Sequence, residues 1–186
     1  MKRLFDLLFG MLSLIIMIIP LILLSIGIKL TSEGPVLFWS KRVGRNNIIF
    51  EMPKFRTMKI NTPMIATHLI EEPELFLTSF GKFLRKTSLD ELPQIYSILK
   101  GDLSFVGPRP ALYNQYDLIK LRKNNSIDKL IPGLTGWAQI NGRDDISISE
   151  KVDFDLEYLE RRSFLFDLEI IWHTFIKVLK REGVSH

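Results

Sequence analysis

The chain has 186 residues, 46% of them hydrophobic, and a formal net charge of +4 at pH 7. This length suits a single domain with a modest core. Because the sequence contains no cysteine, disulfides, thiolate metal sites and cysteine nucleophiles are excluded. The basic residues are spread along the chain without a nucleic-acid-binding motif, so we expect no nucleic-acid partner. The positive balance instead suits anionic lipids or phosphorylated substrates.

The first element is an apolar segment. No charged residue occurs between Leu7 and Ile28, and a helix over this run would be about 33 Å long, enough to cross a ~30 Å hydrocarbon core. Pro20 lies inside it and is expected to bend the helix. Basic residues such as Lys2 and Lys29 flank both ends, which favours placing both ends on one membrane face. The sequence therefore predicts a re-entrant helix-break-helix segment over residues 1–30, with Pro20 near its deepest point.

Two other interpretations compete for this segment. A straight transmembrane helix is compatible with its length and stays open as an alternative. A cleaved signal peptide is disfavoured, because the apolar run is too long and no small-residue cleavage site follows it.

The remaining residues, 31–186, are expected to form one catalytic domain at the membrane surface. Two β-prone runs, 36–40 and 48–52, enclose a turn-rich stretch and predict a β-hairpin. A glycine-rich block at 132–143 predicts a loop with close backbone approach. Apolar residues at three- and four-residue spacing predict helices over 71–85, 89–100, 113–123, 149–161 and 165–181. The expected fold is therefore mainly α with a small β-hairpin (α+β), ending in amphipathic helices.

An acidic pair, Asp90 and Glu91, closely follows Arg85 at the expected start of a helix. One interpretation is a capping box, in which Ser88 caps the helix and Glu91 reaches back. The other is catalytic. Neighbouring residues on a helix point about 100° apart, so the two carboxylates would serve different roles, such as nucleophile and base or metal ligand.

A stiff turn, Gly107-Pro108-Arg109-Pro110, follows the acidic pair in the sequence. Its prolines fix the backbone around a single arginine. A nucleophilic carboxylate, clustered cations and rigid turns are what phosphoryl transfer requires, because its transition state is stabilised mainly by positioning and electrostatics.

Together these motifs resemble the bacterial sugar transferases, the monotopic phosphoglycosyl transferases of glycoconjugate assembly, and the length resembles their small, catalytic-core-only members. The matching blocks occur in the family's order and extend over most of the chain. They are KFRTM at 54–58, TSLDELPQ at 87–94, GDLSFVGPRP at 101–110, and PGLTGW at 132–137 continuing through Arg143.

The resemblance implies a two-step reaction on a UDP-sugar at the cytoplasmic face of the bacterial inner membrane. Asp90 would attack the β-phosphate, releasing UMP and leaving a phosphosugar on the aspartate. A polyprenyl (undecaprenyl) phosphate would then accept the phosphosugar, in the first membrane step of glycoconjugate assembly. Mg²⁺ would bridge the diphosphate beside Asp90 and Glu91, in keeping with its preference for carboxylate and phosphate oxygens.

The resemblance also suggests further site residues. Arginine forks pair bidentately with phosphate, so the substrate-binding candidates include Arg56, Arg85 and Arg109. Asp155 and Asp167 are further polar candidates, with exposed helix charges as the alternative. Trp137 is a candidate for stacking on a base or for the membrane interface, with core packing as the alternative. The matched motifs address phosphates and the nucleotide, and no segment is assigned to sugar recognition or self-association.

Two rival functions stay open. A membrane glycosyltransferase would transfer the sugar alone and release UDP. A non-catalytic membrane-anchored scaffold would use the acidic pair only to cap a helix.

Overall fold

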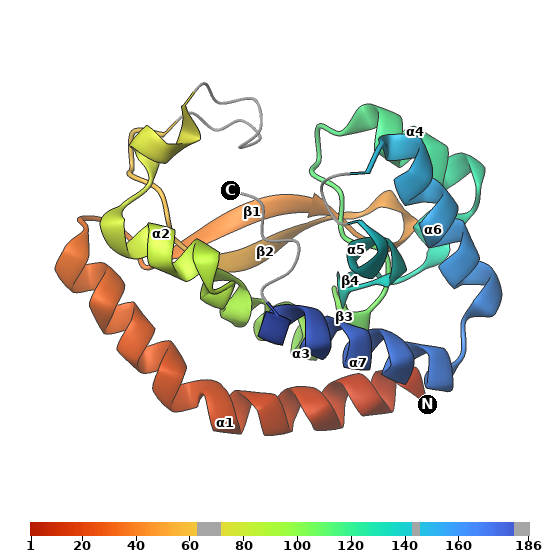
Figure 1. Ribbon diagram of the computed structural model, residues 1–186, viewed down its shortest axis with the longest axis horizontal. Helices are drawn as coiled ribbons and strands as arrows, with labels where there is room; N and C mark the ends of the chain where they lie inside the picture. Colours follow the sequence, from red (N-terminus) through yellow and green to blue (C-terminus); the bar gives the residue numbers. More distant parts are fainter. Residues whose placement is uncertain (63–71, 143–145, 181–186) are drawn as a thin grey trace.

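The structure, a computed structural model, describes residues 1–62, 72–142 and 146–180. A long helix, α1 (Lys2–Thr31), runs along one edge of a compact body of shorter helices and two small sheets (Figure 1). The predicted α+β fold with a hairpin and an apolar N-terminal helix is confirmed. Its other α-helices are α2 (Ser79–Lys86), α3 (Ile95–Lys100), α4 (Tyr116–Asn124), α5 (Trp137–Asn141), α6 (Ile148–Arg161) and α7 (Phe164–Lys180).

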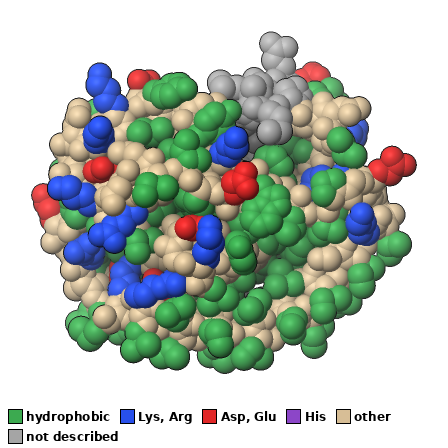
Figure 2. Space-filling model, turned by 180° about the vertical axis from the view of Figure 1, so that it is seen from behind, with side chains coloured by type: hydrophobic (Ala, Val, Ile, Leu, Met, Phe, Trp, Pro, Cys, Tyr) green, Lys and Arg blue, Asp and Glu red, His purple; other side chains and the backbone are tan. Residues whose placement is uncertain are grey.

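Helix α1 presents most of its apolar side chains to the outside. Its most apolar 18-residue window has a mean hydropathy of 2.9 and only 6% of it is buried. A soluble core helix of this composition would be covered, so α1 has the length and surface of a membrane-anchoring helix. Figure 2 shows the resulting band of hydrophobic side chains along the lower edge of the molecule, with the charged side chains gathered above it.

The expected break at Pro20 is not present. The α-helix continues through Pro20, from Lys2 to Thr31, and Figure 1 shows a helix that is bent and not interrupted. The physical reason is that a proline removes one backbone donor and crowds the preceding turn, while the remaining hydrogen bonds hold the helix together on both sides. A bend is what a proline inside a continuous helix is expected to cause, and the re-entrant course through the bilayer stays a prediction.

The N-terminal end of α1 is fixed to the catalytic domain by polar contacts. Lys2 Nζ lies 2.6 Å from Asp167 Oδ2 on α7. Arg3 donates to the carbonyl oxygens of Ile98 (2.6 Å) and Leu99 (2.7 Å), in the last turn of α3. Basic side chains are favoured at a helix C-terminus, where they hydrogen-bond the last carbonyls and meet the negative end of the helix dipole. The first turn of α1 is thus bound to two separate helices.

A buried carboxylate adds to this attachment. Asp6 is 2% exposed and accepts hydrogen bonds from Ser104 Oγ (3.0 Å) and Phe105 N (3.1 Å). Both donors belong to β3 (Ser104–Val106), which pairs in parallel with β4 (Gly133–Thr135).

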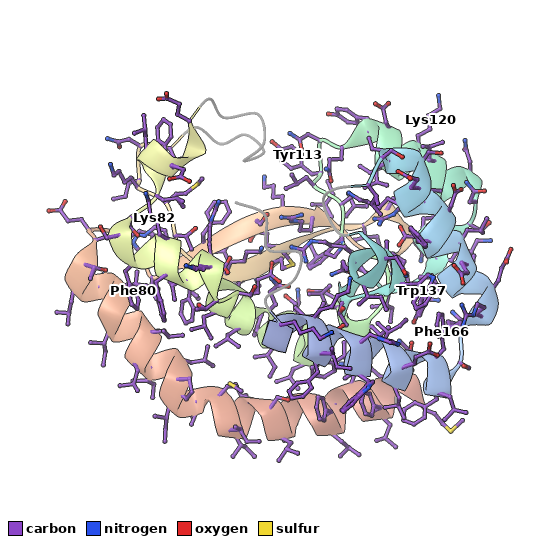
Figure 3. The ribbon with its side chains drawn as sticks, viewed as in Figure 1. Phe80, Lys82, Tyr113, Lys120, Trp137 and Phe166 are labelled. Atoms are coloured by element: carbon purple, nitrogen blue, oxygen red, sulfur yellow. The ribbon has the colours of Figure 1, made fainter. Side chains whose placement is uncertain are left out.

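The C-terminal end of α1 is fixed to the same domain. Ile28 is buried against Phe55 and Leu84, and the Arg56 guanidinium donates to the Ser32 carbonyl (3.1 Å) and hydroxyl (2.8 Å). Close helix packing at this end depends on Gly27, because a Cβ there would lie 2.8 Å from the Phe80 ring of α2. Figure 3 labels Phe80 between α2 and this half of α1.

The hairpin of β1 (Leu37–Val43) and β2 (Ile49–Phe55) crosses the centre of the molecule (Figure 1). The strands are antiparallel, with Trp39 opposite Pro53 and Val43 opposite Ile49, and η1 (Arg45–Asn47) makes the turn. Each strand is longer than predicted, since the ladder continues for three residues beyond each predicted run, to Val43 and Phe55.

Three of the five predicted helices are present with slightly shifted bounds, as α4, α6 and α7, and the 89–100 prediction corresponds to a 3-10 helix, η4 (Leu89–Gln94), followed by α3. The 71–85 prediction corresponds to η3 (Pro73–Phe76) and α2, because Thr78 caps a new helix by accepting from Gly81 N. The glycine-rich block contains β4 and α5 in place of an irregular loop. Residues 71, 143 and 181 of these predicted segments lie outside the described residues.

Candidate functional site

The acidic pair stands at the start of η4 (Leu89–Gln94), a 3-10 helix that leads into α3. Ser88 has a left-handed backbone (φ 55°) and makes no side-chain cap hydrogen bond. The Glu91 side chain turns instead to two cations, Lys54 Nζ (2.8 Å) and Arg109 Nη2 (2.9 Å). The capping-box interpretation is therefore wrong, because Ser88 makes no cap hydrogen bond and the Glu91 carboxylate is paired with two cations.

Glu91 is held as a carboxylate by its two partners. Burial alone would raise its pKa, but the charges and hydrogen bonds of Arg109 and Lys54 outweigh burial and hold the pKa of Glu91 well below its ordinary value. Glu91 is therefore ionised across the physiological range and is poorly suited to accept a proton. Its position fits the alignment of Lys54 and Arg109 better than the role of general base.

Asp90 has a different environment. Among the described residues, no other side chain forms a hydrogen bond or ion pair with its carboxylate. Burial raises its pKa, Lys54 and Arg85 oppose that rise, and the Glu91 charge adds to it. A half-buried carboxylate near two cations, with its pKa moved upward, is suited to act as a nucleophile toward an electrophile that the cations bind.

Arg85 comes from the last turn of α2. Its Nε donates to Thr57 Oγ1 at 3.0 Å, just after β2, and its charge acts on Asp90. The hydroxyl fixes one edge of the guanidinium. Arg85 therefore lies near Asp90, and its role in binding substrate stays a prediction.

Arg109 stands on a turn that the backbone holds tightly. Gly107 N donates to Thr135 O and Gly133 N donates to Pro108 O, both at 2.9 Å. A Cβ on Gly133 would lie 2.1 Å from Gly107 N, so glycine is required at this crossing. The predicted close backbone approach in the glycine-rich block is confirmed, and its partner is the turn that carries Arg109.

Two further arginines clamp the same turn. Arg122 Nη1 donates to the Arg109 carbonyl at 2.7 Å, and Arg42 Nη1 donates to the Pro110 carbonyl at 3.1 Å. Burial and the nearby Arg109 lower the pKa of Arg42 to about 10. Two consecutive carbonyls thus each receive a guanidinium, which fixes the direction in which Arg109 leaves the turn.

Asp155 does not lie with the acidic pair. It is 1% exposed and accepts from Arg122 Nε (2.9 Å) and Nη2 (2.6 Å). Burial raises the pKa of Asp155 and Arg122 opposes this rise. Asp155 is therefore neither an exposed helix charge nor a group seen at the site; it holds Arg122, which holds the turn of Arg109.

Asp167 and Arg56 are likewise engaged elsewhere. Asp167 accepts from the Tyr158 hydroxyl at 2.7 Å and pairs with Lys2, so it attaches α1 to the C-terminal helices. Arg56 donates to Ser32 and to the Glu33 carbonyl at the other end of α1. For both residues the contacts in the structure are attachments of α1, and direct substrate binding stays a prediction that these contacts do not support.

Trp137 packs inside the C-terminal part of the domain. Its ring lies 5.0 Å from that of Phe166, and its Nε1 donates to Glu157 at 2.7 Å. Figure 3 labels both rings between α5 and α7. The core-packing alternative is the one these contacts favour.

The carboxylate oxygens at the site can be compared with the ligands that the expected Mg²⁺ requires. Among the described residues, no group of three or more histidine, aspartate or glutamate side chains could hold a metal ion. Asp90 and the second oxygen of Glu91 are the carboxylate oxygens at the site. This set fits Mg²⁺, which is commonly held by one or two carboxylates together with substrate phosphates, and does not fit a metal held by protein alone.

The structure adds Lys54, Thr57, Arg42 and Arg122 to the residues proposed from sequence. Lys54 and Thr57 lie in the matched KFRTM block, which was a usable signal. No sequence motif pointed to Arg42 or Arg122, because each donates to a backbone carbonyl that is not its neighbour in the sequence.

Comparison with known proteins identifies the family. The sequence model for the bacterial sugar transferases matches residues 1–181. EpsL of Bacillus subtilis, named as an uncharacterized sugar transferase, is 40% identical over 185 residues, covering 100% of this chain and 90% of that protein. The Escherichia coli UDP-glucose:undecaprenyl-phosphate glucose-1-phosphate transferase is 38% identical over 186 residues, covering 95% of this chain and 40% of that protein.

A third relative is the undecaprenyl-phosphate galactose phosphotransferase of Salmonella typhimurium, 34% identical over 202 residues. The chain covers 41% of that protein, so it spans about two-fifths of the length of both named phosphotransferases. The matched family, the coverage of the chain and the cluster around Asp90 agree: this protein belongs to the bacterial sugar transferase family and is a transferase enzyme.

Proposed function

We propose that this protein transfers a phosphosugar from a UDP-sugar to a polyprenyl phosphate and releases UMP. The named relatives act on a UDP-sugar or on undecaprenyl phosphate, which supports the substrates. The observation that supports the mechanism best is that the two carboxylates of the acidic pair have different surroundings. Glu91 is paired with Lys54 and Arg109, whereas the half-buried Asp90 carboxylate has no side-chain partner among the described residues and lies near the charges of Lys54 and Arg85.

The reaction follows in two displacements. An Asp90 carboxylate oxygen attacks the β-phosphorus, the bond from that phosphorus to the bridging oxygen breaks, and UMP leaves with the bridging oxygen. The sugar phosphate is then held on Asp90 as an acyl phosphate. A phosphate oxygen of the acceptor attacks the same phosphorus, which frees the Asp90 carboxylate and yields a polyprenyl diphosphate-sugar. Lys54, Arg85 and Arg109 offset the phosphate charge, the main requirement of phosphoryl transfer.

Asp90 and Glu91 would hold Mg²⁺ when it arrives with the diphosphate. When bound, the ion neutralises charge on the phosphate oxygens and makes UMP a better leaving group. The chain's own part is to keep Glu91 ionised and Lys54 and Arg109 in place around it.

A re-entrant course for α1, with the active site on the cytoplasmic face, belongs to the same proposal. Both ends of α1 contact one domain, through Asp167 and Asp6 at the start and Arg56 at the end. A helix that crossed the bilayer would carry its ends to opposite sides, and one compact domain could not bind both. The contacts at the two ends therefore support entry and exit on one face.

Cysteine accessibility tests this topology in a chain that has no cysteine of its own. One cysteine is inserted after Met1 and, in a second variant, Glu33→Cys places it just past α1. A re-entrant helix makes both sites react with an impermeant maleimide in inverted vesicles and neither react in intact spheroplasts. Labelling of the two sites from opposite faces would establish a spanning helix.

The pKa shifts predict the pH dependence of the first displacement. Asp90 must be ionised to attack, and its pKa is raised above the ordinary 3.8, so activity falls with acid at a higher pH than for an ordinary aspartate. Burial lowers the pKa of Lys54 below the ordinary 10.5, so activity also declines at a lower alkaline pH than for an ordinary lysine.

UMP release without acceptor, measured across pH, checks this. Lys54→Met removes a charge that lowers the pKa of Asp90, so the acid limb of the variant should move to still higher pH. An acid limb that stays where it was would contradict the assigned electrostatics.

The nucleotide product tests the function itself. Purified protein is given a panel of UDP-sugars, undecaprenyl phosphate and Mg²⁺, with an EDTA control. We expect UMP and a polyprenyl diphosphate-sugar with at least one donor. UDP as the product would establish the rival membrane glycosyltransferase, and no turnover with any donor would favour a scaffold.

A further inference from the structure

We infer that an apolar groove between α1 and the β1–β2 hairpin holds the hydrocarbon chain of the polyprenyl phosphate acceptor. The inference rests on the proposed function and adds a binding site to it. The groove has a volume of about 410 Å³, within the ~300–1,000 Å³ typical of small-molecule sites.

The walls of the groove come from three parts of the chain. Leu14 and Leu21 belong to α1, Trp39 and Pro53 to the hairpin, and Pro93 and Tyr96 to η4 and α3. The Ser25 hydroxyl, which also lines the groove, donates to the Leu21 carbonyl of its own helix at 2.6 Å. The lining therefore suits a hydrocarbon and offers little to a polar ligand.

The groove is connected to the nucleophile through η4. Side chains three residues apart on a 3-10 helix lie over one another, about 6 Å along the axis. Asp90 and Pro93 have this spacing within η4, so the nucleophile stands one turn beyond a residue that lines the groove.

Charge and polarity match an amphiphilic ligand along this direction. Lys54 and Arg85 act on Asp90 at one end, where the acceptor's phosphate must lie to attack the phosphorus. Apolar side chains continue from there toward α1, whose outer face exposes Ile15 (68%), Ile19 (65%) and Ile22 (54%). A prenyl chain leaving the phosphate would follow this path into the lipid. The donor nucleotide is polar and would gain nothing from an apolar path.

Groove-filling substitutions test the inference. Ser25→Phe and Leu14→Trp add bulk inside the groove, while Ile26→Phe and Ile15→Trp add the same rings at neighbouring exposed positions of α1. Each protein is assayed in nanodiscs with a short acceptor, farnesyl phosphate, and a long one, undecaprenyl phosphate. UMP release without acceptor is measured in parallel.

The groove variants should raise the apparent KM for undecaprenyl phosphate about tenfold, as expected from withdrawing roughly two methylene groups from an apolar site. The KM for farnesyl phosphate should change less, and acceptor-free UMP release should match wild type, as should all values for the exposed variants. An unchanged ratio of the two KM values, or an equal change in the exposed variants, would overturn the inference. If the wild-type protein released no UMP at all, the proposed function itself would be refuted.

Photo-crosslinking covers the case in which a groove variant fails to fold. A polyprenyl phosphate with a diazirine on an early isoprene unit, bound to the wild-type protein, should label peptides that contain Leu21 or Tyr96. Labelling confined to the outer face of α1, or equal labelling of the groove by a diazirine phospholipid, would show that the groove takes no specific acceptor chain.

Discussion

Asp90→Asn should lower the rate of UMP release by about 10⁴-fold or more, the scale of loss seen when a nucleophile is removed. The amide has nearly the shape of the carboxylate but neither its charge nor its nucleophilic oxygen. Among the described residues, no other side chain forms a hydrogen bond or ion pair with the Asp90 carboxylate. Its replacement should therefore leave the contacts of Glu91 intact. The free energy of unfolding should therefore change by less than about 1 kcal/mol.

Asp117→Asn is the matched control, because Asp117 is exposed on α4. It should keep wild-type turnover. Stopped-flow measurement of UMP, with denaturant unfolding of each variant in detergent, checks both quantities. An Asp90→Asn variant with more than about one-tenth of wild-type activity would remove Asp90 from the mechanism.

The second large effect is expected at the buried pair of Arg122 and Asp155. Their side chains are 9% and 2% exposed, and removing one partner leaves the other charged in the interior. Arg122→Leu and Asp155→Leu should each lower the free energy of unfolding by about 3–5 kcal/mol. Removing the exposed pair of Lys82 and Glu74, whose side chains are 53% and 68% exposed, should cost no more than about 1 kcal/mol.

The double variant separates stability from positioning. A buried ion pair replaced by apolar side chains often regains the lost stability, so the Arg122→Leu, Asp155→Leu protein should unfold near wild type. Its turnover should stay about tenfold low or lower, because the Arg109 carbonyl has lost its donor and the turn is free to shift. Recovery of both stability and turnover would mean that the pair acts only in folding.

Local patterns were enough to predict the hairpin, the apolar helix and the positions of α4, α6 and α7, but not α5 or the start of α2. Strands and helices follow from the period of apolar residues along a few turns of chain. Four of the candidate site residues proposed from sequence lie close together in the structure because short contiguous motifs carry them: Asp90, Glu91, Arg85 and Arg109.

The remaining assignments depended on contacts between distant parts of the chain. Asp155 and Asp167 looked alike as acidic helix residues, yet one pairs with Arg122 and the other with Lys2, and no local pattern separates these partners. The course at Pro20 also depended on packing, since α1 keeps its helical bonds while both its ends are attached to one domain.

The covalent intermediate on Asp90 is the central claim, and intact-protein mass measurement tests it most directly. Wild-type protein is mixed with Mg²⁺ and its active UDP-sugar, without acceptor, and quenched. We expect a mass increase equal to one sugar phosphate, one UMP per enzyme, and neither with Asp90→Asn; adding polyprenyl phosphate should remove the adduct. Turnover that releases UDP, or UMP release with the adduct on a residue other than Asp90, would contradict this mechanism.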